Sequence, residues 1–375
     1  MIVDAHTHIW TGQMPEKSYF PPRQNWHVSV AWAYSGQSGG VTPPYTKNPE
    51  ALYPKQELRM SDPDGSYTIA NMDEAGIDAA VVFTIDYDYV WGQESGLSVE
   101  DKHRIYGELQ RKYPGRLVCT AGPDPRRFNA FEMYKRAIEE HKLTGLKLVP
   151  AAGYYAWDPM LYPFYEYSID NGQPVWFCTE VSRGSYRYTR FQEPVHISDM
   201  THDFPDLTVV LAHIGANYYN WFEQCLNAGA SNPNVYLQDG GPGWVISFGY
   251  NKNNPTGGPW SNAFNDEPLI MTMLNKAKEA VGAHRIMWGG GNGGSGPSQN
   301  TESKLANGYG WRNLVQWWRD LPKRAEKYGF KWTDEEVDMV LGANAAHVMG
   351  LKRDPQREIL HKFGWRRLYP PPRDV

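Results

Sequence analysis

The sequence is poor in cysteine and contains no long apolar run. Its 375 residues include three cysteines, an odd and sparse set that excludes a disulfide framework. No stretch approaches the ~18 consecutive apolar residues of a membrane span, and the first residues lack the basic and apolar regions of a signal peptide. The net charge of −5 shows no basic excess. We therefore expect a cytoplasmic protein that binds neither nucleic acid nor a membrane.

Aromatic residues, by contrast, are abundant, with 15 Trp and 24 Tyr. Rings with a polar tip fill cores and subunit interfaces, and they also form flat walls for cyclic ligands. Both interpretations stay open for the chain as a whole. Within the second interpretation, Trp10 and Tyr154 are our candidates for contact with a small-molecule substrate that contains a ring.

Short apolar runs alternate with helix-like stretches along the chain. Such alternation is typical of a parallel sheet covered by helices, and eight strand–helix units over this length favour a closed barrel. We therefore predict an α/β fold, a (β/α)₈ TIM barrel formed by residues 1–375 as a single domain. The predicted strands cover residues 2–5, 79–85, 116–120, 146–149, 175–179, 207–212, 235–237 and 286–288.

Two long insertions are predicted at the end of the barrel where active sites lie. Residues 11–66, rich in Pro, Gly, Trp and Tyr, follow the first strand, and residues 240–268, rich in Gly, Asn and Pro, follow the seventh. Insertions at the carboxyl ends of barrel strands often carry lids and binding residues. The basic, proline-rich tail, residues 354–375, is expected to pack on the barrel or on a partner subunit.

A pair of histidines at the end of the first strand is the strongest chemical signal. His6 and His8 are two residues apart, so side-chain alternation places both on one face, directed into the barrel mouth. Two imidazoles at this spacing can chelate a divalent ion. His213 follows the sixth strand and reaches the same mouth, as a general acid–base or as a further ligand. We expect these three histidines to mark the active site, and a metal-free catalytic or structural pair stays open as the alternative.

A family resemblance is carried by segments spread over nearly the whole chain: VDAHTHIW, MDEAGIDAAVVF, GLKLVP, LYPFYEYSIDNGQPVWF, DFPDLTVVLAHIGAN, NPNVYLQDG, HRIMWGG and VLGANAAHVMGL. Together they resemble the amidohydrolase superfamily, in the branch of aminocarboxymuconate semialdehyde decarboxylase. The resemblance implies a divalent metal, Zn or Mn, held by the two histidines of strand one, a histidine on strand five and an aspartate on strand eight. A histidine on strand six, matched by His213, would lie beside the metal. The resemblance also implies a homodimer.

The chain departs from this family pattern at two ligand positions. Cys178 stands where the strand-five histidine is expected, and Gly291 stands where the strand-eight aspartate is expected. Cys178 could ligate as a thiolate, which would give the set His6, His8, His213 and Cys178, or it could be a small buried filler. A bound metal and its complete loss therefore both remain open.

Two carboxylates are candidate catalytic partners of His213. Glu180 lies two residues beyond Cys178 on the same predicted face, and Asp86 follows the second strand. Either could serve as the general base or share a proton with the imidazole. A salt bridge for Glu180 and a capping or solvated role for Asp86 are the structural alternatives.

Basic residues supply candidates for binding the substrate. Arg183 and Arg187 lie in the segment after the fifth strand, and the guanidinium fork binds carboxylates bidentately. A solvated loop is the alternative. Lys147, within the fourth strand, is interpreted as one member of an ion pair in the barrel interior.

The resemblance implies an enzyme of the lyase or hydrolase type. We expect a non-oxidative decarboxylase, a C–C lyase that acts on a small cyclic or aromatic carboxylic acid through His6, His8 and His213. A hydrolase or hydratase of the same family is an alternative, weakened by Gly291, because the missing aspartate commonly handles the proton of a reactive water. A metal-free lyase or isomerase on a degenerate metal site is the second alternative.

Overall fold

The computed structural model of the protein describes residues 1–9, 62–86, 98–179, 188–215, 219–239, 267–290 and 311–352. The predicted insertions, apart from residues 62–66 and 267–268, and the tail from 354 onward lie outside these described residues. Among the described helices, none combines the length and the apolar character that a membrane crossing requires.

Eight parallel strands form the barrel that the sequence predicts. They are β1 (Val3–Thr7), β2 (Ala79–Val82), β3 (Leu117–Cys119), β4 (Leu146–Leu148), β5 (Val175–Cys178), β6 (Val209–Ala212), β7 (Val235–Gln238) and β8 (Ile286–Met287). Strands β1 to β3 form one hydrogen-bonded group and β4 to β8 form another. Backbone bonds close both gaps: Lys147 N–H donates to the Ala121 carbonyl at 2.8 Å, and Ala5 N–H donates to the Trp288 carbonyl at 3.2 Å.

The strands are buried on both faces, which explains why they read as continuous apolar runs. On β5, Val175 and Phe177 pack in the cluster between the barrel and the helices. Trp176, between them in sequence, packs with Val210 of β6 inside the barrel. Residues alternate between faces along a strand, so a parallel strand covered on both sides needs apolar residues at every position.

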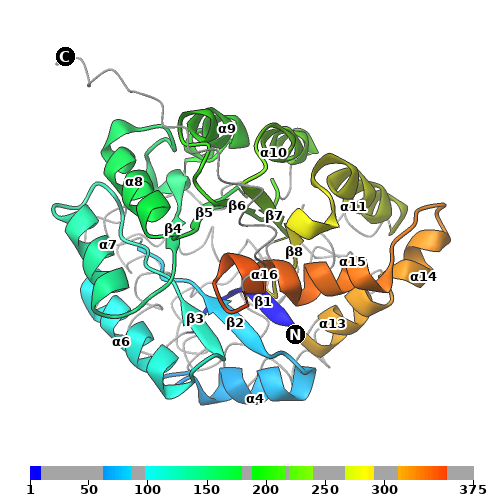
Figure 1. Ribbon diagram of the computed structural model, residues 1–375, viewed down its shortest axis with the longest axis horizontal. Helices are drawn as coiled ribbons and strands as arrows, with labels where there is room; N and C mark the ends of the chain where they lie inside the picture. Colours follow the sequence, from blue (N-terminus) through cyan, green and yellow to red (C-terminus); the bar gives the residue numbers. More distant parts are fainter. Residues whose placement is uncertain are drawn as a thin grey trace, which may run out of the picture.

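Helices surround the strands as an outer ring (Figure 1). The described ones are α4 (Ser66–Ala75), α6 (Val99–Lys112), α7 (Ala130–Glu139), α8 (Tyr162–Asp170), α9 (Pro194–Asp203), α10 (Tyr219–Ser231), α11 (Glu267–Val281), α13 (Trp311–Arg319), α14 (Leu321–Glu326), α15 (Asp334–Asp338) and α16 (Asn344–Val348). Short 3₁₀ segments cover Pro150–Ala152, Pro159–Leu161, Thr189–Phe191 and Ala283–Arg285, and a π-helical turn covers Met339–Ala343.

Helix α16 closes one end of the barrel. Ala345 and Ala346 pack with Val3 and Ala79, which lie at the starts of their strands. The amino-terminal end is therefore filled by apolar side chains. The opposite end, where the strands finish, is the end at which barrel enzymes carry their active sites.

Candidate active site

A bulge in β1 turns His6 into the barrel. Ala5, the preceding residue, already packs in the interior, so strict alternation would direct His6 outward. The register of β1 against β2 shifts between Asp4 and Thr7. An extra residue of this kind bends a strand and re-aims the neighbouring side chains. The His6 ring consequently meets Phe83, an interior residue, at 4.6 Å between ring centroids.

Asp4 holds this bulge in place. Its Oδ1 accepts hydrogen bonds from the His6 N–H at 2.9 Å and from the Gly290 N–H at 2.7 Å, so it ties β1 to the residues after β8. The side chain is fully buried, and burial raises the pKa of its carboxyl to about 7. A Cβ at Gly290 would overlap the Trp311 indole nitrogen and lie 2.7 Å from Asp4 Oδ2, so the position requires glycine.

The three predicted histidines lie together at the mouth of the barrel. The ring centroids of His6 and His8 are 5.3 Å apart, and those of His6 and His213 are 4.8 Å apart. His6 and His8 are buried. The imidazoles therefore form one cluster that joins the ends of β1 and β6.

His6 is held as a neutral imidazole. Its Nδ1 lies 3.0 Å from Oε1 of Gln238, at the end of β7. An amide oxygen only accepts hydrogen bonds, so this contact assigns the ring proton to Nδ1 and leaves the lone pair on Nε2. Burial lowers the pKa of His6 well below its ordinary value, and the charges of Lys147, His213 and His8 lower it further.

His213 lies in a strained turn. Its φ is 75°, that of Ile214 is 42°, and that of Gly215 is 67°. Left-handed backbone is uncommon for residues other than glycine, and for a β-branched residue it is a true outlier. A Cβ at Gly215 would lie 2.5 Å from the carbonyl carbon of Trp221, so this position too requires glycine. Such strain persists only where the surroundings enforce it, commonly at functional sites.

Thr179, directly after β5, fixes this turn. Its Oγ1 donates to the Ala212 carbonyl at 2.6 Å and accepts from the Gly215 N–H at 3.0 Å. The two bonds hold the backbone on either side of His213. Thr179 is not among the site residues predicted from the sequence, although a hydroxyl at the end of a buried apolar strand was an available signal.

Replacing Thr179 with valine is expected to lower the free energy of unfolding by about 1–3 kcal/mol, because the buried Gly215 N–H loses its acceptor. Urea unfolding of Thr179→Val against the parent measures the loss. Thr179→Ser keeps the hydroxyl and serves as the matched control. Equal stability of the valine and serine variants would contradict the role given to the hydroxyl.

Lys147 and two aromatic rings line the barrel interior beside the histidines. The Lys147 Nζ lies 4.5 Å from the centroid of the Phe83 ring, and that ring contacts Trp176 at 5.0 Å. Lys147 is buried. Burial is the main cause of the lowered pKa of His6, and the charge of Lys147 lowers it further. The interior next to the cluster is therefore aromatic and positively charged.

The described residues do not on their own make up a complete site for a divalent metal. Among them, no group of three or more His, Cys, Asp or Glu side chains is arranged to hold an ion. Cys178, the candidate fourth ligand, is buried at the end of β5. The Gln238 contact leaves the Nε2 lone pair of His6 able to accept a proton or to bind a ligand.

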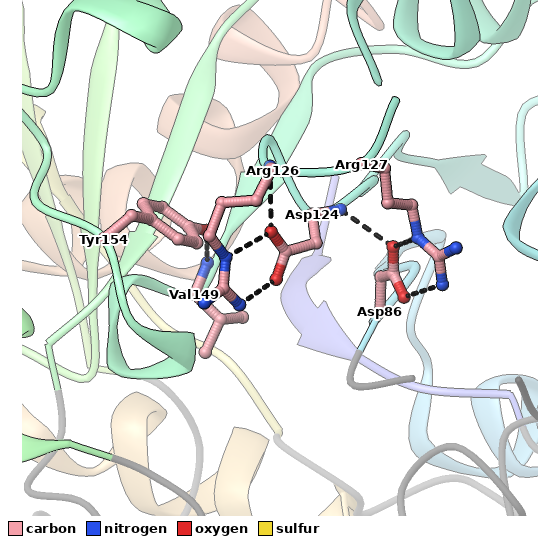
Figure 2. Close-up of polar contacts among 6 residues, drawn as sticks. All are labelled: Asp86, Asp124, Arg126, Arg127, Val149 and Tyr154. Atoms are coloured by element: carbon pink, nitrogen blue, oxygen red, sulfur yellow. Dashed lines mark hydrogen bonds and ion pairs between the residues drawn. The ribbon is translucent and has the colours of Figure 1, made fainter. Parts of the chain in front are cut away.

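Asp86, a predicted catalytic carboxylate, forms an ion pair with Arg127 (Figure 2). Arg127 Nε and Nη2 donate to the carboxylate at 2.5 and 2.9 Å, and the Asp124 N–H donates at 2.8 Å. Burial acts to raise the pKa of Asp86, but the Arg127 hydrogen bonds and charge and the Asp124 N–H outweigh it and lower the pKa. The carboxylate is thus held ionised and directed at Arg127.

Replacing Arg127 with methionine is expected to destabilise the protein by about 3–5 kcal/mol, because the Asp86 carboxylate stays buried without its cation. The two side chains are 11% and 1% exposed, so solvent screening is weak. Thermal or urea unfolding measures the effect. The double variant Arg127→Met, Asp86→Asn should regain most of the loss, and failure to regain it would contradict the ion-pair explanation.

Tyr154, a predicted substrate contact, supports a second ion pair next to the first (Figure 2). Its hydroxyl accepts the Val149 N–H at 2.9 Å, and the Arg126 guanidinium lies 5.8 Å from its ring centroid. Arg126 in turn binds the Asp124 carboxylate through Nε at 2.9 Å and through Nη2 at 2.6 Å. The ring is buried beneath this arginine.

Several predicted site residues cannot be placed against this geometry. The substrate-binding candidates Trp10, Arg183 and Arg187, the catalytic candidate Glu180 and the altered ligand position Gly291 lie outside the described residues.

The amidohydrolase family model matches residues 3–351. The chain belongs to the amidohydrolase family. This membership confirms the prediction of an enzyme of the lyase or hydrolase type. No curated protein sequence gives a significant match.

Solved structures share the fold at low sequence identity. The 5-carboxyvanillate decarboxylase of Sphingomonas paucimobilis is 15% identical, with a TM-score of 0.54 over 93% of this chain and 98% of that chain. The 2,6-dihydroxybenzoate decarboxylase from Rhizobium is 12% identical, with a TM-score of 0.52 over 93% and 98%. The 4-oxalomesaconate hydratase of Rhodopseudomonas palustris is 14% identical, with a TM-score of 0.50 over 97% and 99%.

Proposed function

We propose that this amidohydrolase is a non-oxidative decarboxylase, a C–C lyase that acts on small cyclic or aromatic carboxylic acids. The observation that carries the proposal is the cluster of His6, His8 and His213 beside the buried Lys147 and the Phe83 ring. This cluster offers positive charge for a carboxylate, a ring for stacking and imidazoles for proton transfer. A decarboxylase that protonates a ring carbon needs these three properties.

The substrate ring packs against the aromatic wall of Phe83 and Trp176. The substrate carboxylate faces the positive charge of the histidine cluster and the neighbouring Lys147. Because these groups are buried, they attract the carboxylate more strongly than they would in water. His6, held neutral by burial and oriented by Gln238, supplies its Nε2 lone pair as an acceptor for a substrate hydroxyl. The substrate is thereby oriented with the carboxylate-bearing carbon toward His213.

His213 in its protonated form donates its proton to that ring carbon. The bond between the ring carbon and the carboxylate then breaks, its electron pair restores the aromatic system, and CO₂ leaves. The neutral imidazole regains a proton from solvent. General acid catalysis of this kind contributes about 10²–10⁴ to a rate. Glu180 remains a candidate partner for this imidazole, and Arg183 and Arg187 remain candidates for a carboxylate clamp.

The test is release of CO₂ from a panel of hydroxybenzoates in D₂O. We expect CO₂ and an arene with one deuterium at the vacated ring carbon. Mass spectrometry and a coupled bicarbonate assay report both products. A product that has gained the mass of water, with no CO₂, would instead indicate a hydratase or hydrolase and overturn the proposal.

A further inference from the structure

We propose that Gln238 binds the substrate carboxylate through its side-chain amide nitrogen and so sets the preference of the site for an acid. The inference rests on the proposed function, from which it takes the carboxylate as the ligand. Gln238 is not among the site residues predicted from the sequence, and the family resemblance gives it no role.

Gln238 is the last residue of β7, and its side chain lies inside the barrel mouth. Tyr236, two residues earlier, packs with the interior residues, so alternation along the strand directs Gln238 to the same side. The contact of its Oε1 with Nδ1 of His6, at 3.0 Å, agrees with this direction. On the neighbouring strand β6, Gln238 pairs in register with Ala212, the residue directly before His213. The amide therefore belongs to the histidine cluster.

The amide nitrogen of Gln238 is a donor without an acceptor. The side chain is fully buried, and among the described residues nothing accepts a hydrogen bond from its Nε2. This nitrogen lies against Gly289, where a Cβ would be 2.3 Å from it and 2.6 Å from the Cβ of His6. Glycine at this position leaves room for the amide. Buried polar groups in folded proteins nearly always have a partner, so a buried donor without one is typical of a site that a ligand completes.

The backbone donors at this end of β8 already have acceptors. The Gly289 N–H donates to Oδ1 of Asp239, and the Gly290 N–H donates to Oδ1 of Asp4, both at 2.7 Å. They cannot serve a ligand without breaking these bonds. The amide nitrogen of Gln238 only donates, so it pairs with an acceptor on the ligand, and a charged carboxylate oxygen forms the strongest bond of this kind.

The probes are salicylate and its neutral analogue salicylamide, whose binding to the full chain is followed by calorimetry. We expect the parent to prefer salicylate. Gln238→Glu keeps an oxygen for the His6 N–H but replaces the donor with a carboxylate oxygen, which repels salicylate and accepts from the salicylamide NH₂ group. The variant should therefore bind salicylate about 10–100-fold more weakly and should prefer salicylamide.

The matched control is Gln110→Glu, which makes the same change of charge on α6. The Gln110 amide is bonded at both ends, to the Lys142 carbonyl and to the Cys119 N–H, and the variant should keep the parental preference for salicylate. A parent that prefers salicylamide or does not bind salicylate would overturn the inference, and so would a Gln238→Glu variant that still prefers salicylate.

A crystal structure of the parent with salicylate needs no variant, so it decides even if Gln238→Glu fails to fold. We expect a carboxylate oxygen at roughly 2.7–3.2 Å from Nε2 of Gln238. A carboxylate bound elsewhere, or a water on Nε2 in its place, would overturn the inference. If the hydroxybenzoates release no CO₂ while salicylate still binds to Gln238, the proposed reaction fails and this inference stands. Release of CO₂ by a parent whose salicylate lies away from Gln238 has the opposite meaning.

Discussion

Replacing His213 with glutamine is expected to lower the rate of CO₂ release by about 10²–10⁴-fold, with a much smaller change in KM. Glutamine fills a similar volume and forms hydrogen bonds, but it cannot transfer a proton at neutral pH. The strained turn from His213 to Gly215, with positive φ at each residue, fixes where the imidazole lies. Steady-state kinetics on the substrate found in the CO₂ assay measure the change.

The control for this prediction is His202→Gln. His202 is exposed near the end of α9, outside the histidine cluster, so its replacement should leave kcat unchanged. The stability of His213→Gln is measured in parallel, because release of a strained backbone can itself alter the free energy of unfolding. A His213→Gln variant with the parental kcat would remove this residue from the proton-transfer step.

The sequence allowed the barrel to be predicted almost in full, because its strands are buried on both sides. A strand that must pack inward and outward has few polar positions, and turn residues then mark its ends. The prediction of 175–179 corresponds to Val175–Cys178, and that of 146–149 corresponds to Leu146–Leu148. In both cases the predicted strand ends one residue beyond the observed one.

The sequence predicted that His6 and His8 lie close together, and they do, but the physical reason differs from the one predicted. Alternation along a regular strand suggested that they share a face, but the bulge in β1 is what directs His6 inward. The bulge is held by Asp4 and its bond to Gly290, which lies 286 residues away along the chain. A local pattern cannot reveal an irregularity that a distant residue stabilises.

The interaction partners of the polar residues could not be predicted from the sequence either. Asp86 was predicted as a catalytic carboxylate from its place after β2, yet its bidentate partner Arg127 comes from the segment after β3. Lys147 was interpreted as a member of an ion pair, and the structure adds its position over Phe83. Position at a strand end predicts that a side chain reaches the mouth, whereas its chemical state depends on neighbours from other strands.

Acidification is expected to destabilise the protein through His103, which is buried on α6. Its Nε2 accepts the Gly122 N–H at 3.2 Å, and burial lowers the pKa of the imidazole to about 3 despite the nearby Asp86 charge. The native state therefore keeps His103 neutral at a pH where the unfolded chain, with an ordinary histidine pKa of about 6.5, binds a proton. The stabilising contribution is complete above that value and is lost as the pH falls from 6.5 toward 3.

The readout is the slope of the free energy of unfolding against pH, measured by urea titration between pH 7 and pH 4.5. One proton bound only by the unfolded state gives a slope of about 1.4 kcal/mol per pH unit. His103→Gln cannot titrate, so its curve should be flatter than the parent's by about this amount below pH 6. Loss of the Gly122 bond can displace the whole curve at pH 7, but it does not change the slope. The exposed His202→Gln variant should keep the parental slope, and a parental slope in His103→Gln would show that this histidine is not the acid-sensitive group.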